Sequence, residues 1–207
     1  MLEIIKPMDI EKRSFEIITE LLGDTKIAPE NELVVKRVIH TSADFDYAQN
    51  LVFSEGAVAK GIEALRSGCD IVTDTQMARA GINKTILGKL GGEVHCFMSD
   101  PDVAAEAKAR GITRAIVSME KAATLEKPCI FAIGNAPTAL IAIKELMEAG
   151  KLHPALIIGV PVGFVNVVES KELFVHSDIP HIIARGRKGG SNVAAAICNA
   201  MLYQIRR

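Results

Sequence analysis

The sequence contains no tryptophan, and aromatic residues make up only 4% of its 207 residues. The core must therefore be built from Val, Ile, Leu and Ala, which suits strands that are buried on both faces. Hydrophobic residues make up 49% and charged residues 24% of the chain, a balance that excludes intrinsic disorder. This length fits one domain with a complete core, and we expect a single domain over residues 1–207.

No stretch of the chain is rich in Lys and Arg, and the formal net charge is −1. The sequence therefore predicts no binding of nucleic acid, and an anionic ligand would have to be bound by a few individual arginines. No apolar run approaches the ~20 residues of a membrane span. The N-terminal stretch lacks the basic start and the apolar segment of a signal peptide. We expect a cytoplasmic protein with no membrane partner.

Residues that commonly bind metal ions are few and are not grouped. The four cysteines stand far apart among apolar neighbours, which predicts buried, reduced thiols. No two of them have the spacing of a zinc site, and His176 and His181 are not spaced to share one face of a helix. The sequence therefore predicts no metal site.

Helical and strand patterns alternate along the whole chain. This alternation predicts an α/β fold with a mostly parallel sheet and helices on both faces. A Gly closes an amphipathic pattern at position 23, and Asp100 followed by Pro101 is typical of a helix start. The β-branched run LVVKRVIH is interpreted as the first strand, so that the expected strands are 33–40, 69–74, 93–98, 128–134, 155–160 and 181–185.

Polar or glycine-rich residues follow the predicted strands, where ligands bind in open α/β sheets. The segment GNAPT (134–138) predicts Asn135 as a helix N-cap with free N–H groups suited to an anion. The segment RGRKGGS (185–191) adds three cations to the start of the last helix. Neither matches a nucleotide motif, since GxxxxGK[ST] is absent and no GxGxxG follows the first strand. Tight turns alone would also explain these glycines.

His40 ends the predicted strand 33–40 and begins a polar loop. Imidazole gives and takes protons near neutral pH, which makes histidine the usual general acid or base. A buried histidine satisfied by a backbone carbonyl is the structural alternative. Four arginines are candidates for binding carboxylates, because the guanidinium group can bind them bidentately: Arg13, Arg37, Arg79 and Arg114. For any single arginine, a solvated surface position is the alternative.

Six segments stand out along the chain: RSFEII (13–18), RVIHTSADFDYAQNLVFS (37–54), TDTQMARAGI (73–82), IGNAPTAL (133–140), GVPVGFVNVVESKE (159–172) and RGRKGGSNVAAA (185–196). Together and in this order they resemble the precorrin-8X methylmutase family. The resemblance implies an isomerase of cobalamin biosynthesis. Such an enzyme moves a methyl group from C-11 to C-12 of a ring-contracted tetrapyrrole, precorrin-8X or cobalt-precorrin-8, to give hydrogenobyrinate or cobyrinate. The resemblance also implies a homodimer with the active site near the subunit interface. It implies no cofactor, since any cobalt would arrive in the substrate.

The resemblance places the catalytic histidine at His40 and substrate contacts at Ser14, Arg37 and Arg114. The resemblance implies a further contact, commonly threonine in the family, that falls near Asn83, whose side chain keeps a hydrogen-bonding group there.

Asn135, in the matching segment IGNAPTAL, is also expected to bind the polycarboxylate substrate. The stretch ADFDYA (43–48) favours the branch that acts on the cobalt-containing intermediate. We hypothesise that His40 donates a proton to a ring nitrogen or carbon near the migrating methyl group. Either Asp44 or a backbone carbonyl would orient its imidazole.

Two other functions compete with this interpretation. One is a non-catalytic corrinoid carrier, which would bind the tetrapyrrole without changing it. The other is a nucleotide or phosphate-ester enzyme on a doubly wound sheet, with RGRKGGS (185–191) as its phosphate-binding segment.

Overall fold

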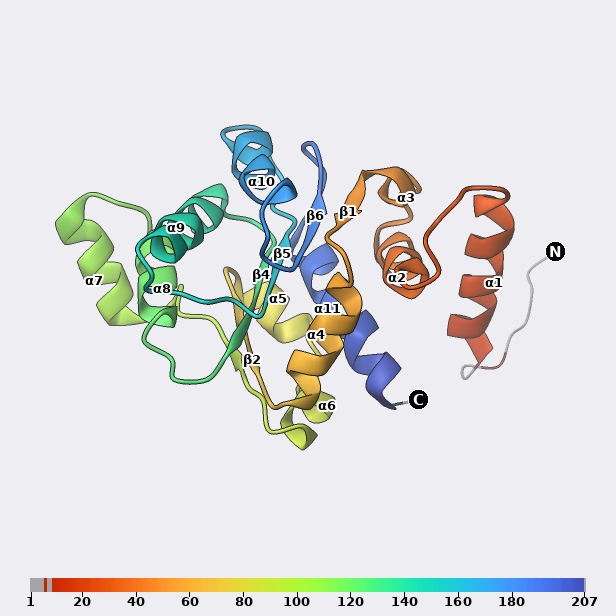
Figure 1. The fold of residues 1–207 in the computed structure, drawn as a ribbon, viewed down its shortest axis with the longest axis horizontal. Coiled ribbons are helices and arrows are strands. Elements are labelled where there is room, and N and C mark those ends of the chain that lie inside the picture. Colours follow the sequence, from red (N-terminus) through yellow and green to blue (C-terminus); the bar gives the residue numbers. More distant parts are fainter. Residues whose placement is uncertain (1–5, 7–8, 207) are drawn as a thin grey trace.

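The computed structural model describes residue 6 and residues 9–206, and the fold is shown in Figure 1. Its strands form one six-stranded sheet in the order β1-β6-β5-β4-β2-β3. All neighbours in this sheet are parallel except β1 and β6, which pair antiparallel. The strands are β1 (Leu51–Phe53), β2 (Asp70–Thr73), β3 (Val94–His95), β4 (Cys129–Ile133), β5 (Leu156–Gly159) and β6 (His181–Ala184).

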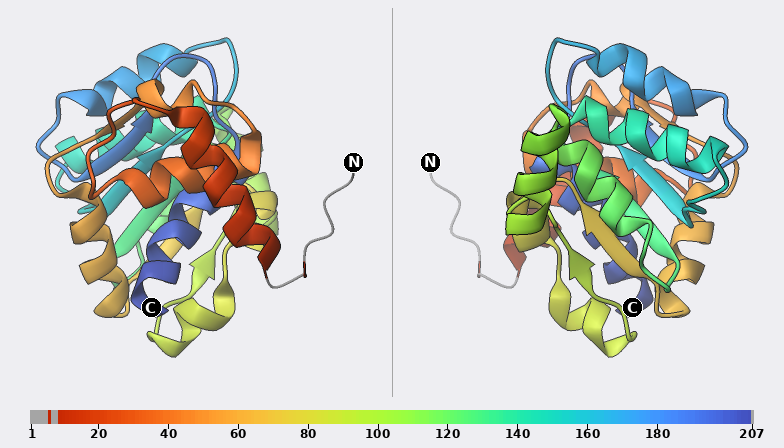
Figure 2. Two further views of the ribbon diagram at one scale, coloured as in Figure 1. Left: turned by 90° about the vertical axis from the view of Figure 1, so that its right-hand side faces the viewer. Right: turned by 90° about the vertical axis from the view of Figure 1, so that its left-hand side faces the viewer.

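Helices cover both faces of the sheet, as Figure 2 shows from its two sides. Side chains of α1, α2, α4 and α11 share one apolar core, and those of α8, α9 and α10 share the other. The helices are α1 (Ile10–Leu22), α2 (Glu32–Ser42), α3 (Tyr47–Asn50), α4 (Ala57–Arg66), α5 (Gln76–Gly81), α6 (Lys84–Lys89), α7 (Pro101–Arg110), α8 (Arg114–Ala122), α9 (Pro137–Glu148), α10 (Val167–Val175) and α11 (Ser191–Arg206).

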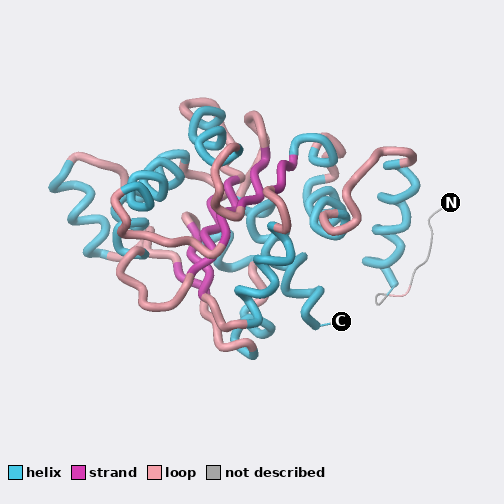
Figure 3. Tube along the Cα trace, viewed as in Figure 1, coloured by secondary structure: helices cyan, strands magenta, loops and turns pink. Residues whose placement is uncertain are grey.

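Successive residues of the central strands point into the two cores. In β4, Ile130 and Ala132 face the first core, whereas Phe131 and Ile133 face the second. Both faces are buried, so the strands read as continuous apolar runs instead of alternating ones. Figure 3 shows the strands crossing the middle of the molecule with helices on either side. The predicted α/β fold with a mostly parallel sheet is therefore confirmed.

The prediction of a first strand at 33–40 is wrong, because these residues belong to the helix α2. Val34, Val35, Val38 and Ile39 are buried, and this i, i+1, i+4, i+5 spacing places them on one face of a helix. That face packs mainly on α11. Packing on the long last helix outweighs the preference of β-branched residues for strands. The first strand is the short edge strand β1, and the other five predicted strands are confirmed in position.

All four cysteines are buried and free, as predicted. Burial raises the pKa of Cys69 and Cys198 to about 12 and that of Cys129 to about 11. These thiols are therefore protonated near neutral pH and act as small apolar side chains. None of the helices in the described residues is long and apolar enough to span a membrane.

Candidate active site

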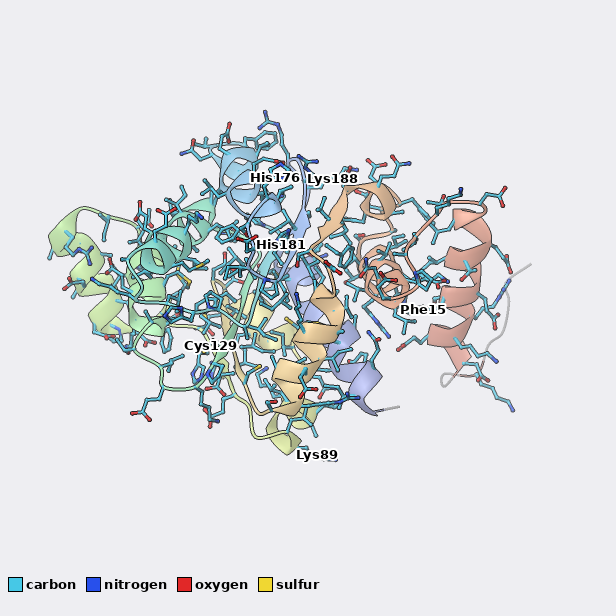
Figure 4. All side chains as sticks on the ribbon, viewed as in Figure 1. Phe15, Lys89, Cys129, His176, His181 and Lys188 are labelled. Atoms are coloured by element: carbon cyan, nitrogen blue, oxygen red, sulfur yellow. The ribbon has the colours of Figure 1, made fainter. Side chains whose placement is uncertain are left out.

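His40 lies in the last turn of α2, with its side chain exposed. Its ring centroid is 5.5 Å from that of Phe15 on α1, and the two ring planes are tilted by 37°. Figure 4 labels Phe15, which projects from α1 toward α2. In the described part of the chain the imidazole makes no hydrogen bond. Both ring nitrogens are therefore open to a ligand, and one edge of the ring packs on Phe15.

Arg37 lies one helical turn before His40 and is only 13% exposed. Its guanidinium carbon is 4.8 Å from the centroid of the Phe15 ring and 5.0 Å from that of Tyr203 on α11. One of its nitrogens donates a hydrogen bond of 2.5 Å to Glu11. Two aromatic rings and a carboxylate thus hold the cation in one orientation.

Ser14 is half-buried on α1, next to Phe15. Its hydroxyl donates a hydrogen bond of 2.9 Å to the carbonyl of Ile10, one turn earlier in the same helix. The contacts of Phe15 with His40 and Arg37 bring these three side chains together where α1 packs on α2, and Ser14 precedes Phe15 in α1.

Asn83 joins the start of α6 to α11. Its side-chain oxygen accepts the N–H of Ile86 at 3.0 Å and so caps α6, while its own N–H donates to Asn199 at 2.8 Å. Thr and Asn are both good N-cap residues. Asn83 therefore acts as the N-cap of α6.

The prediction of Asn135 as a helix N-cap with free N–H groups is wrong. Ala136 is the N-cap of α9, and the buried carboxylate of Asp74 accepts the N–H groups of Gly134, Asn135 and Ala136 at 2.8, 2.8 and 2.6 Å. Burial raises the pKa of Asp74, and these three hydrogen bonds act in the opposite direction. The protein's own carboxylate thus occupies the expected anion site, while the side chain of Asn135 stays exposed.

Arg114 is the first residue of α8, on the other side of the sheet from His40. Its side chain is exposed, and the residue before it, Thr113, bonds Thr138 at the start of α9 over 3.0 Å. Arg114 therefore lies near Asn135, beyond the carboxyl ends of the strands. The structure does not bring these two residues together with the cluster of Ser14, Arg37 and His40.

The loop 185–191 packs tightly at the carboxyl end of the sheet. A Cβ atom on Gly189 would lie 2.1 Å from the carbonyl oxygen of Val160, so this close approach requires glycine. Lys171 is fully buried and donates two hydrogen bonds of 2.8 Å, to the carbonyls of Gly186 and Lys188. The buried ammonium group of Lys171 therefore holds this loop in place.

Lys188, labelled in Figure 4, joins this loop to the segment that follows His40. Its ammonium group lies 2.7 Å from Asp44 and 2.6 Å from Asp46. The hydrogen bond from Lys188 lowers the pKa of Asp44. Asp44 is thus bonded to Lys188, and among the described residues neither Asp44 nor a backbone carbonyl makes a hydrogen bond to the His40 imidazole. The ring in contact with His40 is Phe15.

Phe15, Tyr203, Asp74 and Lys171 were not singled out in the sequence. Phe15 lies beside Ser14 in the segment 13–18 and could have been noted there. Asp74 follows a buried strand, which is a usable signal for a site residue. Nothing in the sequence indicates that Tyr203 meets Arg37, because 165 intervening positions separate them.

Within the described residues, no group of three His, Cys, Asp or Glu side chains is arranged to bind a metal ion.

Three comparisons with known proteins point to the same family, and each of them covers nearly the whole chain. The family model described as precorrin-8X methylmutase matches residues 9–204. The cobalt-precorrin-8 methylmutase of Salmonella typhimurium is 47% identical over 98% of each chain, and the precorrin-8X methylmutase of Pseudomonas aeruginosa is 39% identical over 93% of each. The crystal structure of precorrin-8X methylmutase from Thermus thermophilus superimposes with a TM-score of 0.87 at 36% identity, covering 96% of this chain and 98% of that one. The chain belongs to the precorrin-8X methylmutase family.

Proposed function

We propose that this chain moves a methyl group from C-11 to C-12 of cobalt-precorrin-8, with His40 as the proton donor. Family membership makes the chain an isomerase of the methylmutase type that serves cobalamin biosynthesis. One observation supports the role of His40. Its imidazole makes no hydrogen bond in the described residues, and it lies against the same Phe15 ring as the guanidinium group of Arg37, which also contacts Tyr203. The relative from Salmonella, at 47% identity, is named for the cobalt-containing substrate, which supports this substrate here.

In the proposed reaction the protein has two tasks, to bind the substrate and to transfer a proton. The bond from the methyl group to C-11 breaks and a bond to C-12 forms, with no net oxidation. A proton placed by His40 on the conjugated ring favours the rearranged arrangement of double bonds, and its return regenerates the imidazolium. Arg37 binds a carboxylate on the rim of the macrocycle, which fixes the reacting carbons relative to His40. Ser14 and Asn83 supply hydrogen bonds, and Arg114 and Asn135 contact more distant parts of the substrate. Any cobalt belongs to the substrate, and the protein contributes no cofactor.

The surface of α1 supports a homodimer. Ile10, Ile17 and Leu21 are 52%, 38% and 66% exposed, and their spacing places them on one stripe of the helix. Within the described chain α1 packs mainly on α2, at one edge of the molecule (Figure 1). Ser14 lies on the same stripe as Ile10 and Ile17. We propose that a second copy covers this stripe, so that the site at Ser14 and His40 lies near the subunit interface.

The decisive experiment compares His40→Ala and His40→Asn with the wild type in a turnover assay on cobalt-precorrin-8, followed by absorbance. Both variants are expected to keep the wild-type circular dichroism and lose at least about 100-fold in rate. His153→Ala is the matched control, because His153 is also exposed but lies in the connection before β5. Substantial turnover by a folded His40→Ala protein would defeat the role of His40.

The same assay tests the alternatives. A carrier would leave the spectrum of the bound tetrapyrrole unchanged, whereas the mutase shifts it. A nucleotide enzyme would be stabilised by ATP or NAD in a thermal-shift experiment. Leu21→Glu tests the dimer, because a carboxylate on the apolar stripe is expected to give monomers by size-exclusion chromatography with light scattering. A wild-type protein that is monomeric at micromolar concentration would rule the dimer out.

A further inference from the structure

We infer that Arg187 and Phe164 form a second substrate subsite, in which Arg187 binds a carboxylate of the macrocycle and Phe164 packs against its apolar surface. The inference rests on the proposed function for the class of ligand. It goes beyond that function by assigning a binding role to two loops that lie outside the cluster of Ser14, Arg37 and His40.

The first observation is the pairing of the three cations in the loop 185–191. Arg185 makes two hydrogen bonds to Glu172, of 2.9 and 2.8 Å, and Lys188 bonds Asp44 and Asp46. Arg187 lies between these two residues and is exposed. Among the described residues it meets no carboxylate. It is therefore available for an anionic ligand, whereas Arg185 binds one carboxylate through two of its nitrogens and Lys188 binds two carboxylates.

The second observation is the exposure of apolar side chains beside Arg187. Phe164 is 81% exposed and Val165 is 78% exposed, both in the loop that follows β5. The guanidinium carbon of Arg187 lies 5.6 Å from the centroid of the Phe164 ring. A cation beside an exposed aromatic ring suits a ligand that is flat and apolar in its centre and carries carboxylates at its edge.

The third observation is that the two loops are held in place. Arg187 donates a hydrogen bond of 3.1 Å to the carbonyl of Phe164, and its own carbonyl accepts the N–H of Gly163 at 3.1 Å. Asn166, in the same loop as Phe164, has a φ of 56°, a left-handed conformation that costs a residue other than glycine free energy. Lys171 bonds the carbonyls on both sides of Arg187. The backbone that carries Phe164 and Arg187 is thus held in place by hydrogen bonds between the two loops.

The position of the loop supports one continuous site. Lys188 follows Arg187 and is bonded to Asp44, four residues after His40. A macrocycle bound at His40 therefore has this loop beside it. The charge of the surface favours a polycarboxylate ligand over an apolar face of a second copy of the chain, because the unpaired Arg187 would have to lose its water there without a partner.

The experiment measures binding of a cobalt corrinoid polycarboxylate and of its fully methyl-esterified form by absorbance titration, with turnover measured in parallel. Arg187→Gln is expected to weaken binding of the polycarboxylate by about tenfold or more and to leave binding of the ester within about twofold. Phe164→Ala is expected to weaken binding of both forms. The matched control is Arg185→Gln, which removes a paired cation from the same loop and is expected to bind as the wild type does.

Three outcomes overturn the subsite. One is an Arg187→Gln protein that binds the polycarboxylate as tightly as the wild type in an active enzyme. The second is an equal loss in Arg187→Gln and Arg185→Gln. The third is a Phe164→Ala protein that becomes monomeric, which would assign the surface to a contact between copies. A wild type that binds the corrinoid without turnover contradicts the proposed catalysis but leaves the subsite standing. A wild type that binds no corrinoid overturns both.

Discussion

The guanidinium group of Arg37 lies between the rings of Phe15 and Tyr203, which come from α1 and α11 at opposite ends of the chain. A long cationic side chain normally samples many rotamers, and ordering it costs free energy when a ligand binds. Here the contacts with the two rings and with Glu11 already order the Arg37 side chain in the folded protein. In the proposed function, the carboxylate of the substrate meets a cation that is already ordered, which strengthens binding.

Tyr203→Leu is expected to weaken substrate binding by about 3- to 30-fold, the range of a partly desolvated cation–π contact. The rate at saturation should change little, since His40 does not touch Tyr203. KM and kcat measured on cobalt-precorrin-8 check this. Tyr203→Phe keeps the ring and should behave as the wild type. A Tyr203→Leu protein with unchanged KM would show that the ring does not orient Arg37.

Phe15→Leu is expected to lower kcat as well as raise KM, because Phe15 contacts both His40 and Arg37. We expect a loss in kcat of about tenfold, since small displacements of an acid–base group have large effects on rate. Comparison with Tyr203→Leu isolates the effect on His40. If both variants change only KM, Phe15 does not position the imidazole.

Asp74→Asn is expected to lower the free energy of unfolding by about 2–4 kcal/mol. The buried carboxylate accepts three backbone N–H groups, and the amide would turn a donor toward at least one of them. Urea denaturation followed by circular dichroism measures the change. Asp102→Asn, at an exposed position on α7, is the control and should change the free energy by less than about 0.5 kcal/mol. Equal stabilities of the two variants would contradict the structural role of Asp74.

Lys171→Met tests the buried ammonium group through the pH dependence of stability. Burial lowers the pKa of Lys171 from 10.5 to about 8. Between these two pH values the unfolded chain holds a proton that the folded chain has released, so raising the pH favours the folded state. The wild type should therefore gain roughly 1–3 kcal/mol relative to Lys171→Met between pH 8 and 10.5.

The buried cysteines act in the opposite direction over the same pH range, because burial raises their pKa values. Both proteins contain them, so their effect cancels in the difference. Parallel curves of unfolding free energy against pH for the two proteins would show that Lys171 is not protonated differently in the folded and unfolded states.

The site was predictable where the chemistry of a residue type narrows its role. Histidine is the usual proton donor near neutral pH, and the resemblance of six segments is the basis for proposing His40 and its neighbours as site residues. The orientation of these residues was not predictable. Asp44 was one candidate for orienting His40, yet Lys188 from the other end of the chain occupies it. The free N–H groups expected near Asn135 are bound by Asp74, a residue 61 positions earlier.

The pattern of short apolar runs between amphipathic stretches dictates the α/β class and five of the six strands, because strands buried on both faces must be apolar along their whole length. The run at 33–40 has the same composition, and only its contact with α11 decided that it is a helix. Tertiary structure also decided which charges are neutralised. Arg185 and Lys188 are paired and Arg187 is not, because ion pairs depend on distances in space between residues far apart in the chain.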